Sequence, residues 1–367
     1  MRGLWQRLLP RKNRFLGIDV GAHEVKAAEV RIIEGAPEVV ALRRVPSPPG
    51  AWTEQVDEDA LVEALKQVAG PHLKEAITCI GGEQVVARTV RLPRMSEKEM
   101  EAAARFEVEK FVPTPVDQLI VRYVPLERPV SEEALSTPRA AAARAREAQG
   151  PPGGQEEGQS VLLLAVPAAT VFRYHSIFSR AGLVVTAVDH HAFALWRLFG
   201  RATAGTLALA DVGAETSHLV VVRDEEIKFV RLLPIGGSAL TRRLMDAYGV
   251  ELAEAEEMKR EAAVGVDGDQ GSPGAIGAGD FLIAGLSEIA REIRRSLEFC
   301  ASQDGLTVER LVLSGGSSKQ RGLAEFLQAD LGVTVEVGVP QLEFGPGVVF
   351  DPAFAVAVGL ALREVAS

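Results

Sequence analysis

The sequence has few cysteines, no long apolar run and no excess of positive charge. Its two cysteines, Cys79 and Cys300, show neither metal-ligand spacing nor a disulfide framework, so we expect buried thiols in a reducing cytoplasm. The pair His190–His191 has no partner at the i,i+4 spacing, which argues against a metal site there. No apolar stretch approaches the roughly 20 residues of a membrane-spanning helix, and no secretory signal is visible. A net charge of −10 argues against broad nucleic-acid binding, which needs clustered Lys and Arg.

The sequence does have the length and composition of a globular protein with two cores. It has 367 residues, of which 47% are hydrophobic and 25% charged, so two lobes or domains are expected. Its N-terminal segment alternates basic and apolar residues, a pattern that fits either contact with an anionic membrane surface or a frayed end. The basic residues of this segment are Arg2, Arg7, Arg11, Lys12 and Arg14.

The tetrapeptide Asp-Val-Gly-Ala occurs twice, at Asp19–Ala22 and at Asp211–Ala214. Each copy lies between two short apolar runs, which is the pattern of strand, tight turn and strand. Backbone N–H groups in such a turn can contact an anion, and a nearby carboxylate can hold Mg²⁺ through water. The sequence therefore predicts two similar half-domains that hold a nucleotide triphosphate between them, with Asp19 and Asp211 as the metal-binding carboxylates. The predicted phosphate contacts are Gly21, Ala22, His23, Gly213, Ala214, Glu215, Thr216 and Ser217.

Three further segments are candidates for nucleotide contacts. The loop after the predicted strand Leu311–Leu313 contains paired glycines, which let a ribose or base approach the backbone closely. Glu256 and Lys259 share one face of a predicted helix and can reach ribose hydroxyls and adenine, although a solvated helix face with a weak ion pair is an alternative. The remaining candidates are Gly236 and Gly237 after a predicted strand, and Gly315, Gly316, Ser317, Ser318 and Lys319 in the loop.

The element order predicts two lobes and an inserted α+β module. The pairing of Ser96 with Glu99 predicts a capping box for a helix that ends near Phe111. Segments 126–159 and 265–279 have too few large apolar groups to offset the entropy of ordering, so we expect mobile loops there. The predicted parts are lobe one (14–84, 185–204 and 346–367), the inserted module (85–184), the core of lobe two (205–240 and 305–345) and its upper subdomain (241–304).

Taken together, these motifs resemble the actin-like ATPase superfamily, with its two phosphate loops and its adenosine loop. Within it, the chain resembles the FtsA-like branch and, more closely, the PilM family of type IV pilus assembly proteins. The closer resemblance depends on the inserted module and on several helix motifs rather than on the phosphate loops. The segments that carry it are Arg91–Pro93, Phe106–Pro113, Ala255–Lys259, Arg294–Phe299, Gly315–Ser317 and Phe354–Leu362.

The resemblance implies a two-lobed α/β fold of the actin-like (ribonuclease H-like) type, with a small α+β subdomain inserted in lobe one. It also implies a cytoplasmic protein that binds ATP and Mg²⁺ and docks the cytoplasmic N-terminal tail of the membrane protein PilN at the inner membrane. In relatives the tail lies in a groove between lobe one and the inserted module. The candidate groove residues are Arg91, Arg105, Glu109 and Phe111, and ordinary packing within the module is the alternative for each.

The chain departs from the superfamily pattern at places that bear on turnover. Many relatives have glycine or hydroxyl residues where this chain has Ala214 and Glu215, and a Ser or Thr where it has His23. The Glu215 carboxylate would repel phosphates unless it faces away or binds metal. Asp189 lies where relatives carry a catalytic acid, although a helix N-cap is its alternative role. We therefore expect tight nucleotide binding with slow or absent hydrolysis.

Two other functions remain open from the sequence. A sugar- or acid-kinase of the same superfamily would need an acceptor pocket with a catalytic Asp in the insert, where Asp117 is the candidate. A filament-forming membrane tether of the FtsA type would carry an amphipathic helix after a linker at its C-terminus. The sequence ends at Ser367, directly after a predicted helix, so we do not expect such a tether.

Overall fold

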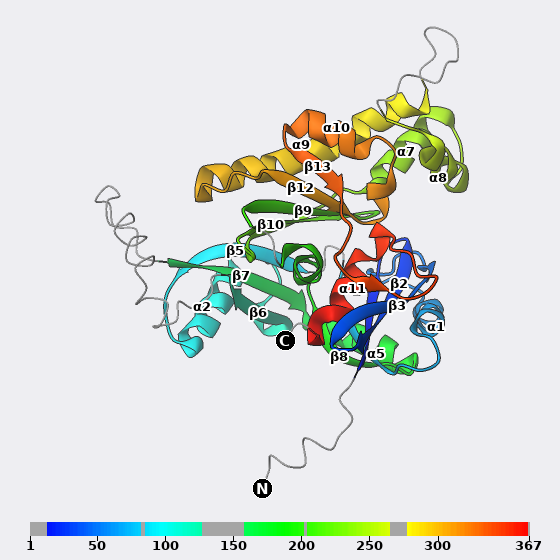
Figure 1. The fold of residues 1–367 in the computed structure, drawn as a ribbon. Helices are drawn as coiled ribbons and strands as arrows, with labels where there is room; N and C mark the ends of the chain where they lie inside the picture. The colour runs from blue at the N-terminus through cyan, green and yellow to red at the C-terminus, as the bar shows by residue number, and fades with distance from the viewer. Residues whose placement is uncertain (1–12, 82–84, 127–157, 202–203, 265–276, 366–367) are drawn as a thin grey trace.

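The computed structural model describes residues 13–81, 85–126, 158–201, 204–264 and 277–365. Within these residues the strands form three sheets, one in each lobe and one in a smaller module (Figure 1). The predicted loops 126–159 and 265–279, and the basic N-terminal segment, lie largely outside the described residues. At their edges the predicted loops extend too far, because Leu126 is buried, Gly158–Pro167 forms a strand and a helix begins at Ala278.

Lobe one is a mixed sheet with apolar helices on both faces. Residues of β1 alternate between the two faces, so that Leu16, Ile18 and Val20 pack against α1 and α5, while Phe15 joins the core on the opposite face with α6 and α11. In order across the sheet, the strands are β14 (Glu343–Phe344), β3 (Ala36–Pro46), β2 (Glu24–Ile33), β1 (Arg14–Val20), β4 (Glu75–Cys79) and β8 (Val184–Asp189). The helices are α1 (Glu58–Ala69), α5 (Ala168–Arg180), α6 (His191–Leu195) and α11 (Ala355–Ala361).

Lobe two repeats the same arrangement of strands. The two lobes share one core, since α6 and α11 pack between the lobe-one sheet and one face of the lobe-two sheet. The other face of the lobe-two sheet packs against its own helices. In order across the sheet, the strands are β11 (Glu226–Leu233), β10 (Ser217–Arg223), β9 (Thr206–Val212), β12 (Arg310–Ser314) and β13 (Thr334–Val337). The helices are α7 (Gly237–Tyr248), α8 (Leu252–Glu261), α9 (Ala278–Asp304) and α10 (Leu323–Leu331).

The inserted module has a separate small core. Its three antiparallel strands are covered by α2 (Glu97–Glu109), which begins with the predicted capping box of Ser96 and Glu99. The strands lie in the order β5 (Val86–Pro93), β7 (Gly158–Pro167) and β6 (Leu119–Pro125). Helix α5 falls within the range 85–184 that the sequence analysis assigned to this module. It packs instead on lobe one, where Tyr174, Ile177 and Phe178 share a core with α1.

The segment after α5 also differs from its prediction. The sequence predicts one helix over Asp189–Phe199, but Asp189 ends strand β8, and the helix N-cap is His190, whose ring nitrogen accepts a hydrogen bond from the amide of Ala192. The N-cap role considered for Asp189 is therefore wrong. Among the described residues, no helix has the length and apolarity needed to cross a membrane.

Candidate functional site

The two repeated turns meet across a single cavity of about 640 Å³ between the lobes. Asp19 and Asp211 both line it, although 192 positions separate them in the sequence (211 − 19). This volume lies within the range of about 300–1,000 Å³ that is typical of small-molecule sites. Most of the sequence-predicted nucleotide residues line the cavity: Gly21, Ala22, His23, Gly213, Ala214, Glu215, Thr216, Gly237, Glu256, Lys259, Gly316, Ser317 and Lys319.

In the first hairpin the aspartate faces a lysine. The antiparallel register of β1 and β2 places Asp19 opposite Lys26, and the Lys26 Nζ lies 2.8 Å from Asp19 Oδ2. Both side chains are largely buried, with 13% and 8% of their surface exposed. Burial alone favours the neutral amine, but the Asp19 carboxylate outweighs it and holds the pKa of Lys26 above its ordinary value. The charge of Asp19 is thus matched by a cation within the same hairpin.

In the second hairpin the equivalent position is a histidine. The register of β9 and β10 places Asp211 opposite His218, whose pKa burial lowers well below its ordinary value, so its imidazole is neutral. Burial raises the pKa of Asp211 to about 6, and the nearby Asp19 carboxylate adds to the effect. The Ser314 hydroxyl donates to Asp211 Oδ1 over 2.9 Å and opposes the rise only in part. Lys26 also lowers the pKa of Asp211 through its charge, but its direct hydrogen bond is with Asp19, so Asp211 is neutralised less completely.

Both turns are closed by the same backbone hydrogen bond. The amide of Gly21 donates to the Glu24 carbonyl over 3.0 Å, and that of Gly213 donates to the Thr216 carbonyl over 3.1 Å. These two glycine amides are therefore used inside the turns. A side chain at Gly213 would meet the Thr216 carbonyl oxygen at 2.6 Å from its Cβ, so the turn requires glycine there.

The third loop is built against the second hairpin. Gly315 has a φ of +86°, and a Cβ there would lie 2.8 Å from the Val212 backbone nitrogen, which only glycine avoids. Ser317 Oγ donates to the Gly213 carbonyl over 2.9 Å, and Ser318 Oγ donates to the Gly315 carbonyl over 2.7 Å. Ser317 thus ties the loop to the turn at the cavity wall, while Gly315 and Ser318 support it without lining the cavity.

A carboxylate that the sequence analysis did not select joins the lobes beside the cavity. Asp351 Oδ2 accepts from Arg44 Nη2 of β3 over 2.7 Å and from Lys319 Nζ of the third loop over 3.0 Å. Burial raises the pKa of Asp351, but the amide of Ala353 together with these two cations outweighs it and holds the pKa below its ordinary value. Arg44, Lys319 and Ala353 all line the cavity.

The helix pair α7 and α8 closes the lobe-two side of the cavity. Lys259 Nζ lies 2.6 Å from Glu256 Oε1 and 2.7 Å from the Thr241 hydroxyl, so the two α8 residues share a polar network. Burial raises the pKa of Glu256, but its hydrogen bonds from Lys259 and Thr241 outweigh it and keep the pKa low. The amide of Gly237 already donates to the Gly213 carbonyl over 2.9 Å, and Gly236 lies beside the same turn without lining the cavity.

The remaining predicted residues lie outside the cavity. Ser217 is buried, and its hydroxyl donates to the Ile235 carbonyl over 2.7 Å. Asp189 forms ion pairs with Arg197 at 2.7 Å and with Arg363 at 3.1 Å, and it does not line the cavity. The kinase candidate Asp117 is exposed on the module and does not line it either.

The four residues proposed for partner binding lie on the module. The guanidinium of Arg105 donates to the Val116 carbonyl over 3.3 Å. Phe111 packs against the module core, and the Arg88 guanidinium lies over its ring at 4.8 Å. Arg91 belongs to β5, and Glu109 is exposed at the end of α2.

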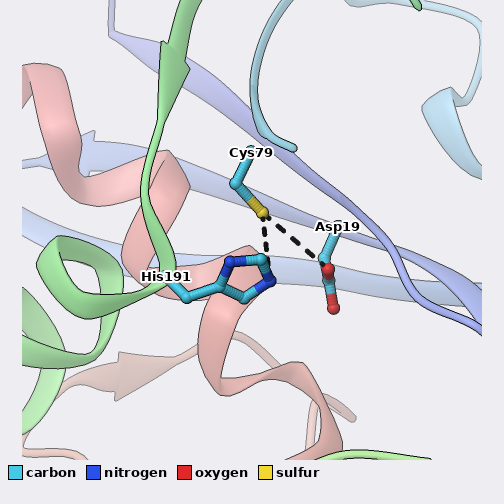
Figure 2. Close-up of side chains that lie close together, drawn as sticks. All are labelled: Asp19, Cys79 and His191. Atoms are coloured by element: carbon cyan, nitrogen blue, oxygen red, sulfur yellow. Dashed lines mark hydrogen bonds between the residues drawn. The ribbon is translucent and has the colours of Figure 1, made fainter. Parts of the chain in front are cut away.

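The structure also brings together side chains that the sequence analysis did not connect. Figure 2 shows Cys79, His191 and Asp19 with their polar atoms pointing toward one another. The Cys79 Sγ lies 3.5 Å from His191 Nε2 and 4.0 Å from Asp19 Oδ1. The His191 ring stacks on that of His218, with ring centroids 4.0 Å apart.

The hairpin register could have predicted Lys26 and His218 from the sequence, since each lies seven residues after a repeated aspartate and opposite it in the hairpin.

Two lobes of the same topology, joined by a shared helix layer and facing each other across paired Asp-x-Gly turns, define the actin-like ATPase fold class. The model of the family "Type IV pilus assembly protein PilM" matches residues 17–149 and 147–365. The chain therefore belongs to the PilM family of type IV pilus assembly proteins, as the sequence motifs predict.

Solved structures agree with this assignment. The "PilM-PilN type IV pilus biogenesis complex" is 30% identical, covers 97% of this chain and 99% of its own, and has a TM-score of 0.75. The ethanolamine utilization protein EutJ from Carboxydothermus hydrogenoformans (16% identity, 96% and 90% coverage, TM-score 0.55) and MreB5 of Spiroplasma citri bound to AMPPNP (11%, 97% and 98%, TM-score 0.50) share the fold.

A relative among characterised proteins lies in the FtsA branch. Cell division protein FtsA of Neisseria meningitidis serogroup B (strain ATCC BAA-335 / MC58) is 25% identical over 171 residues, which are 42% of this chain and 41% of FtsA. The chain thus matches less than half the length of that relative.

Proposed function

We propose that this protein is an ATP-binding adaptor of the type IV pilus inner-membrane assembly platform, which binds the cytoplasmic N-terminal tail of PilN. The observation that carries the proposal is the meeting of both Asp-x-Gly turns in one cavity within a PilM-family fold. The partner assignment is supported by the 30% identical relative, whose structure is that of a PilM–PilN complex. The proposed location is the cytoplasmic face of the inner membrane, where such a tail is exposed.

The residues around the cavity fit ATP with Mg²⁺. Asp19 and Asp211 supply one carboxylate from each lobe to the cavity, where water-mediated Mg²⁺ binding needs oxygen ligands. Because the Gly21 and Gly213 amides are used within their turns, we expect phosphate contacts from the following residues, such as Ala22, His23 and Ala214. Mg²⁺, when bound, would neutralise phosphate and carboxylate charge. Other proteins of this fold have been solved with nucleotide analogues, as in MreB5 with AMPPNP.

We further propose that hydrolysis is slow or absent. The candidate catalytic acid, Asp189, lies outside the cavity with its carboxylate held by Arg197 and Arg363. Its side chain is 3% exposed, so it has little access to a water at the phosphates. Asp117 is likewise outside the cavity, which weighs against the kinase alternative. On this arrangement ATP acts as a bound effector that joins the lobes.

A second cavity is the structural candidate for the tail's apolar anchors. It has a volume of about 250 Å³ and is bounded by β4, α5 and β8, and most of its lining side chains are apolar. β8 is an edge strand of the lobe-one sheet, and β7 of the module runs directly into α5 at Pro167, so the cavity lies where module and lobe join. Edge strands beside apolar pockets suit extended peptides, which add backbone hydrogen bonds to side-chain anchors. Val188, in this strand, is 46% exposed.

The partner proposal is tested by titrating a synthetic PilN-type tail peptide into the protein. Val188→Asp should weaken binding about tenfold or more by placing a charge at the apolar pocket. Val349→Asp is the matched control, because Val349 is 83% exposed and does not line the pocket. Equal affinities for the two variants would reject this pocket, and a failure of the unaltered protein to bind any tail would reject the partner.

The module residues are a second set for the same titration. Arg91→Ala, Arg105→Ala, Glu109→Ala and Phe111→Ala should weaken tail binding if the groove extends onto the module, and they should leave it unchanged if these residues only pack the module.

Nucleotide binding is tested separately, without peptide. Asp19→Ala and Asp211→Ala should each weaken Mg-ATP binding while the circular dichroism spectrum stays folded. Unchanged affinity in both variants would reject the cavity as the nucleotide site. Repeating the peptide titration with and without Mg-ATP then measures the coupling, because two linked sites change each other's affinity by the same factor. Equal tail affinities in the two conditions would reject regulation by nucleotide while leaving both binding sites in place.

A further inference from the structure

Three adjacent parallel strands of lobe one deliver Asp19, Cys79 and His191 to the same edge of the sheet. β1 pairs with β4 in parallel, with Ile18 beside Thr78, so the next residues along both strands are Asp19 and Cys79. β4 pairs with β8 in parallel, with Cys79 beside Asp189, and the chain continues from Asp189 to His191 at the start of α6. The carboxyl ends of these strands thus place a carboxylate, a thiol and an imidazole side by side (Figure 2).

Two of the three polar atoms lie at the spacing of ligands to one tetrahedral metal ion. One oxygen of Asp19, the Cys79 sulfur and a nitrogen of His191 all lie within 4.8 Å of one another. Ordinary zinc–sulfur and zinc–nitrogen bond lengths at a tetrahedral angle place the two ligand atoms about 3.5 Å apart. The observed distance from Cys79 Sγ to His191 Nε2 is 3.5 Å, and that from Cys79 Sγ to Asp19 Oδ1 is 4.0 Å, which a small rotation of the carboxylate would shorten.

We propose that Asp19, Cys79 and His191 form a binding site for a thiophilic divalent cation of the Zn²⁺ class, with water as the fourth ligand. Thiolate and imidazole ligands favour zinc and related transition metals, whereas Mg²⁺ prefers oxygen ligands. The site is therefore distinct in ligand chemistry from the proposed Mg²⁺–nucleotide site, although Asp19 belongs to the walls of both. Binding forms a metal–sulfur bond, releases the Cys79 thiol proton to solvent and requires no oxidant or reductant.

The surroundings orient two of the three ligands and leave a route of entry. Lys26 holds Asp19 by Oδ2, which leaves Oδ1 as the oxygen nearer to Cys79. The stacked ring of His218 fixes the plane of His191. Asp19 and His191 line the larger cavity, so a cation and its water can reach the site from there. Cys79 lines the smaller cavity, so the site lies in the wall between the two.

The His191 ring also has a free nitrogen. Among the described residues, Nδ1 of His191 is buried without a hydrogen-bond partner. A neutral imidazole that carries its proton on Nδ1 presents a lone pair at Nε2, the atom that faces the Cys79 sulfur. The unpartnered nitrogen is therefore compatible with metal ligation through Nε2.

Co²⁺ is the probe, because a thiolate ligand gives it a sulfur-to-metal charge-transfer band and tetrahedral coordination gives it intense visible bands. Untagged full-length protein without nucleotide is titrated with Co²⁺ and then with Zn²⁺. We expect one Co²⁺ per chain with both spectral features, and their loss when Zn²⁺ displaces it. A wild-type protein that shows no charge-transfer band would overturn the proposal.

The two cysteines give a matched pair of variants. Cys79→Ser should abolish the charge-transfer band and weaken Co²⁺ binding about tenfold or more, whereas Cys300→Ser should change neither. Cys300 is the suitable control because it is also a buried cysteine outside any disulfide but lies in the lobe-two core. His191→Asn should keep the sulfur band but lose tetrahedral intensity. A band that survives in Cys79→Ser, or disappears in Cys300→Ser, would place the metal elsewhere and reject the site, provided that each variant melts within a few degrees of wild type.

Discussion

The two Asp-x-Gly hairpins have the same backbone and different charge. In both, the aspartate is paired across the ladder with the residue seven positions later, and the turn is closed by the same glycine amide. In lobe one that residue is Lys26, which forms an ion pair with Asp19. In lobe two it is His218, a neutral imidazole, and Asp211 has a pKa raised to about 6. The duplicated scaffold therefore holds one aspartate that is already neutralised and one that is not.

Because the charges differ, a bound cation would gain more electrostatic free energy beside Asp211 than beside Asp19. A cation added beside Asp19 must share it with Lys26, whereas one beside Asp211 would relieve the cost of a buried carboxylate that the charge of Lys26 offsets only in part. Burial of the ionised Asp211 carboxylate thus costs the second hairpin folding free energy. A cation that binds beside it would reduce that cost. Four substitutions in and around the hairpins test this difference.

Asp19→Asn should destabilise the protein without nucleotide by about 3 kcal/mol, because it leaves the Lys26 ammonium buried without its carboxylate. The variant should remain folded, since domains typically have about 5–15 kcal/mol of stability. Urea denaturation at neutral pH measures the loss. The control is the double variant Asp19→Asn with Lys26→Met, which removes the stranded charge and should recover most of the stability. A single variant as stable as wild type would show that the ion pair contributes nothing.

Asp211→Asn should have the opposite sign and stabilise the protein above about pH 6, by on the order of 1–3 kcal/mol. The folded pKa of Asp211 is raised, so wild type binds more protons folded than unfolded between its ordinary pKa of 3.8 and about 6, and its stability falls as pH rises through that window. The gain from the substitution should therefore be absent near pH 4 and complete above pH 7. Denaturation curves of the variant and wild type at several pH values measure it. A gain that does not depend on pH would contradict the assigned pKa.

Ser314→Ala should cost about 1–2 kcal/mol at pH 7 and less below pH 4. The Ser314 hydroxyl donates to Asp211 Oδ1, so its loss removes the interaction that favours the ionised carboxylate and raises the pKa of Asp211 further. The measurement is thermal unfolding at the two pH values. Ser318→Ala is the control, since its hydroxyl is also buried but donates to the Gly315 carbonyl and should lose stability equally at both pH values.

Glu215→Gln should change stability by less than about 0.5 kcal/mol, because its contact with Arg242 is 3.5 Å long and both side chains are more than half exposed. Glu215 occupies the turn position that His23 occupies in the first hairpin. Removing its charge should strengthen Mg-ATP binding by less than about fivefold, as measured by calorimetric titration. A larger gain would mean that the carboxylate faces the phosphates rather than Arg242.

Local patterns predict the strands, the capping box and the paired turns, because each depends on residues close in sequence. Ser96 with Glu99 and the two Asp-Val-Gly-Ala copies are of this kind. The sheets and the actin-like class followed from the family resemblance as well as from the turns. Strand β8 and the placement of α5 were missed, because Val184–Asp189 alternates only weakly and α5 packs according to tertiary contacts.

The site residues that the sequence analysis did not select fall into two groups. Lys26 and His218 are fixed by hairpin register, which was available from the sequence, since each lies opposite a repeated aspartate. Asp351 and the grouping of Cys79 with His191 depend instead on how distant strands lie in one sheet and on where the chain crosses between lobes. Cysteine spacing alone argues against a metal ligand because the three polar groups come from two strands and the start of a helix, all distant in sequence.

Asp351 forms ion pairs with residues of both lobes. Its Oδ2 atom accepts hydrogen bonds from Arg44 of one lobe and Lys319 of the other. The lobes therefore cannot separate at this edge without breaking at least one of the two contacts. Because all three side chains are partly open to solvent, dissolved salt screens these contacts. Ionic strength should therefore alter the resting angle between the halves of the molecule even when no ligand is present.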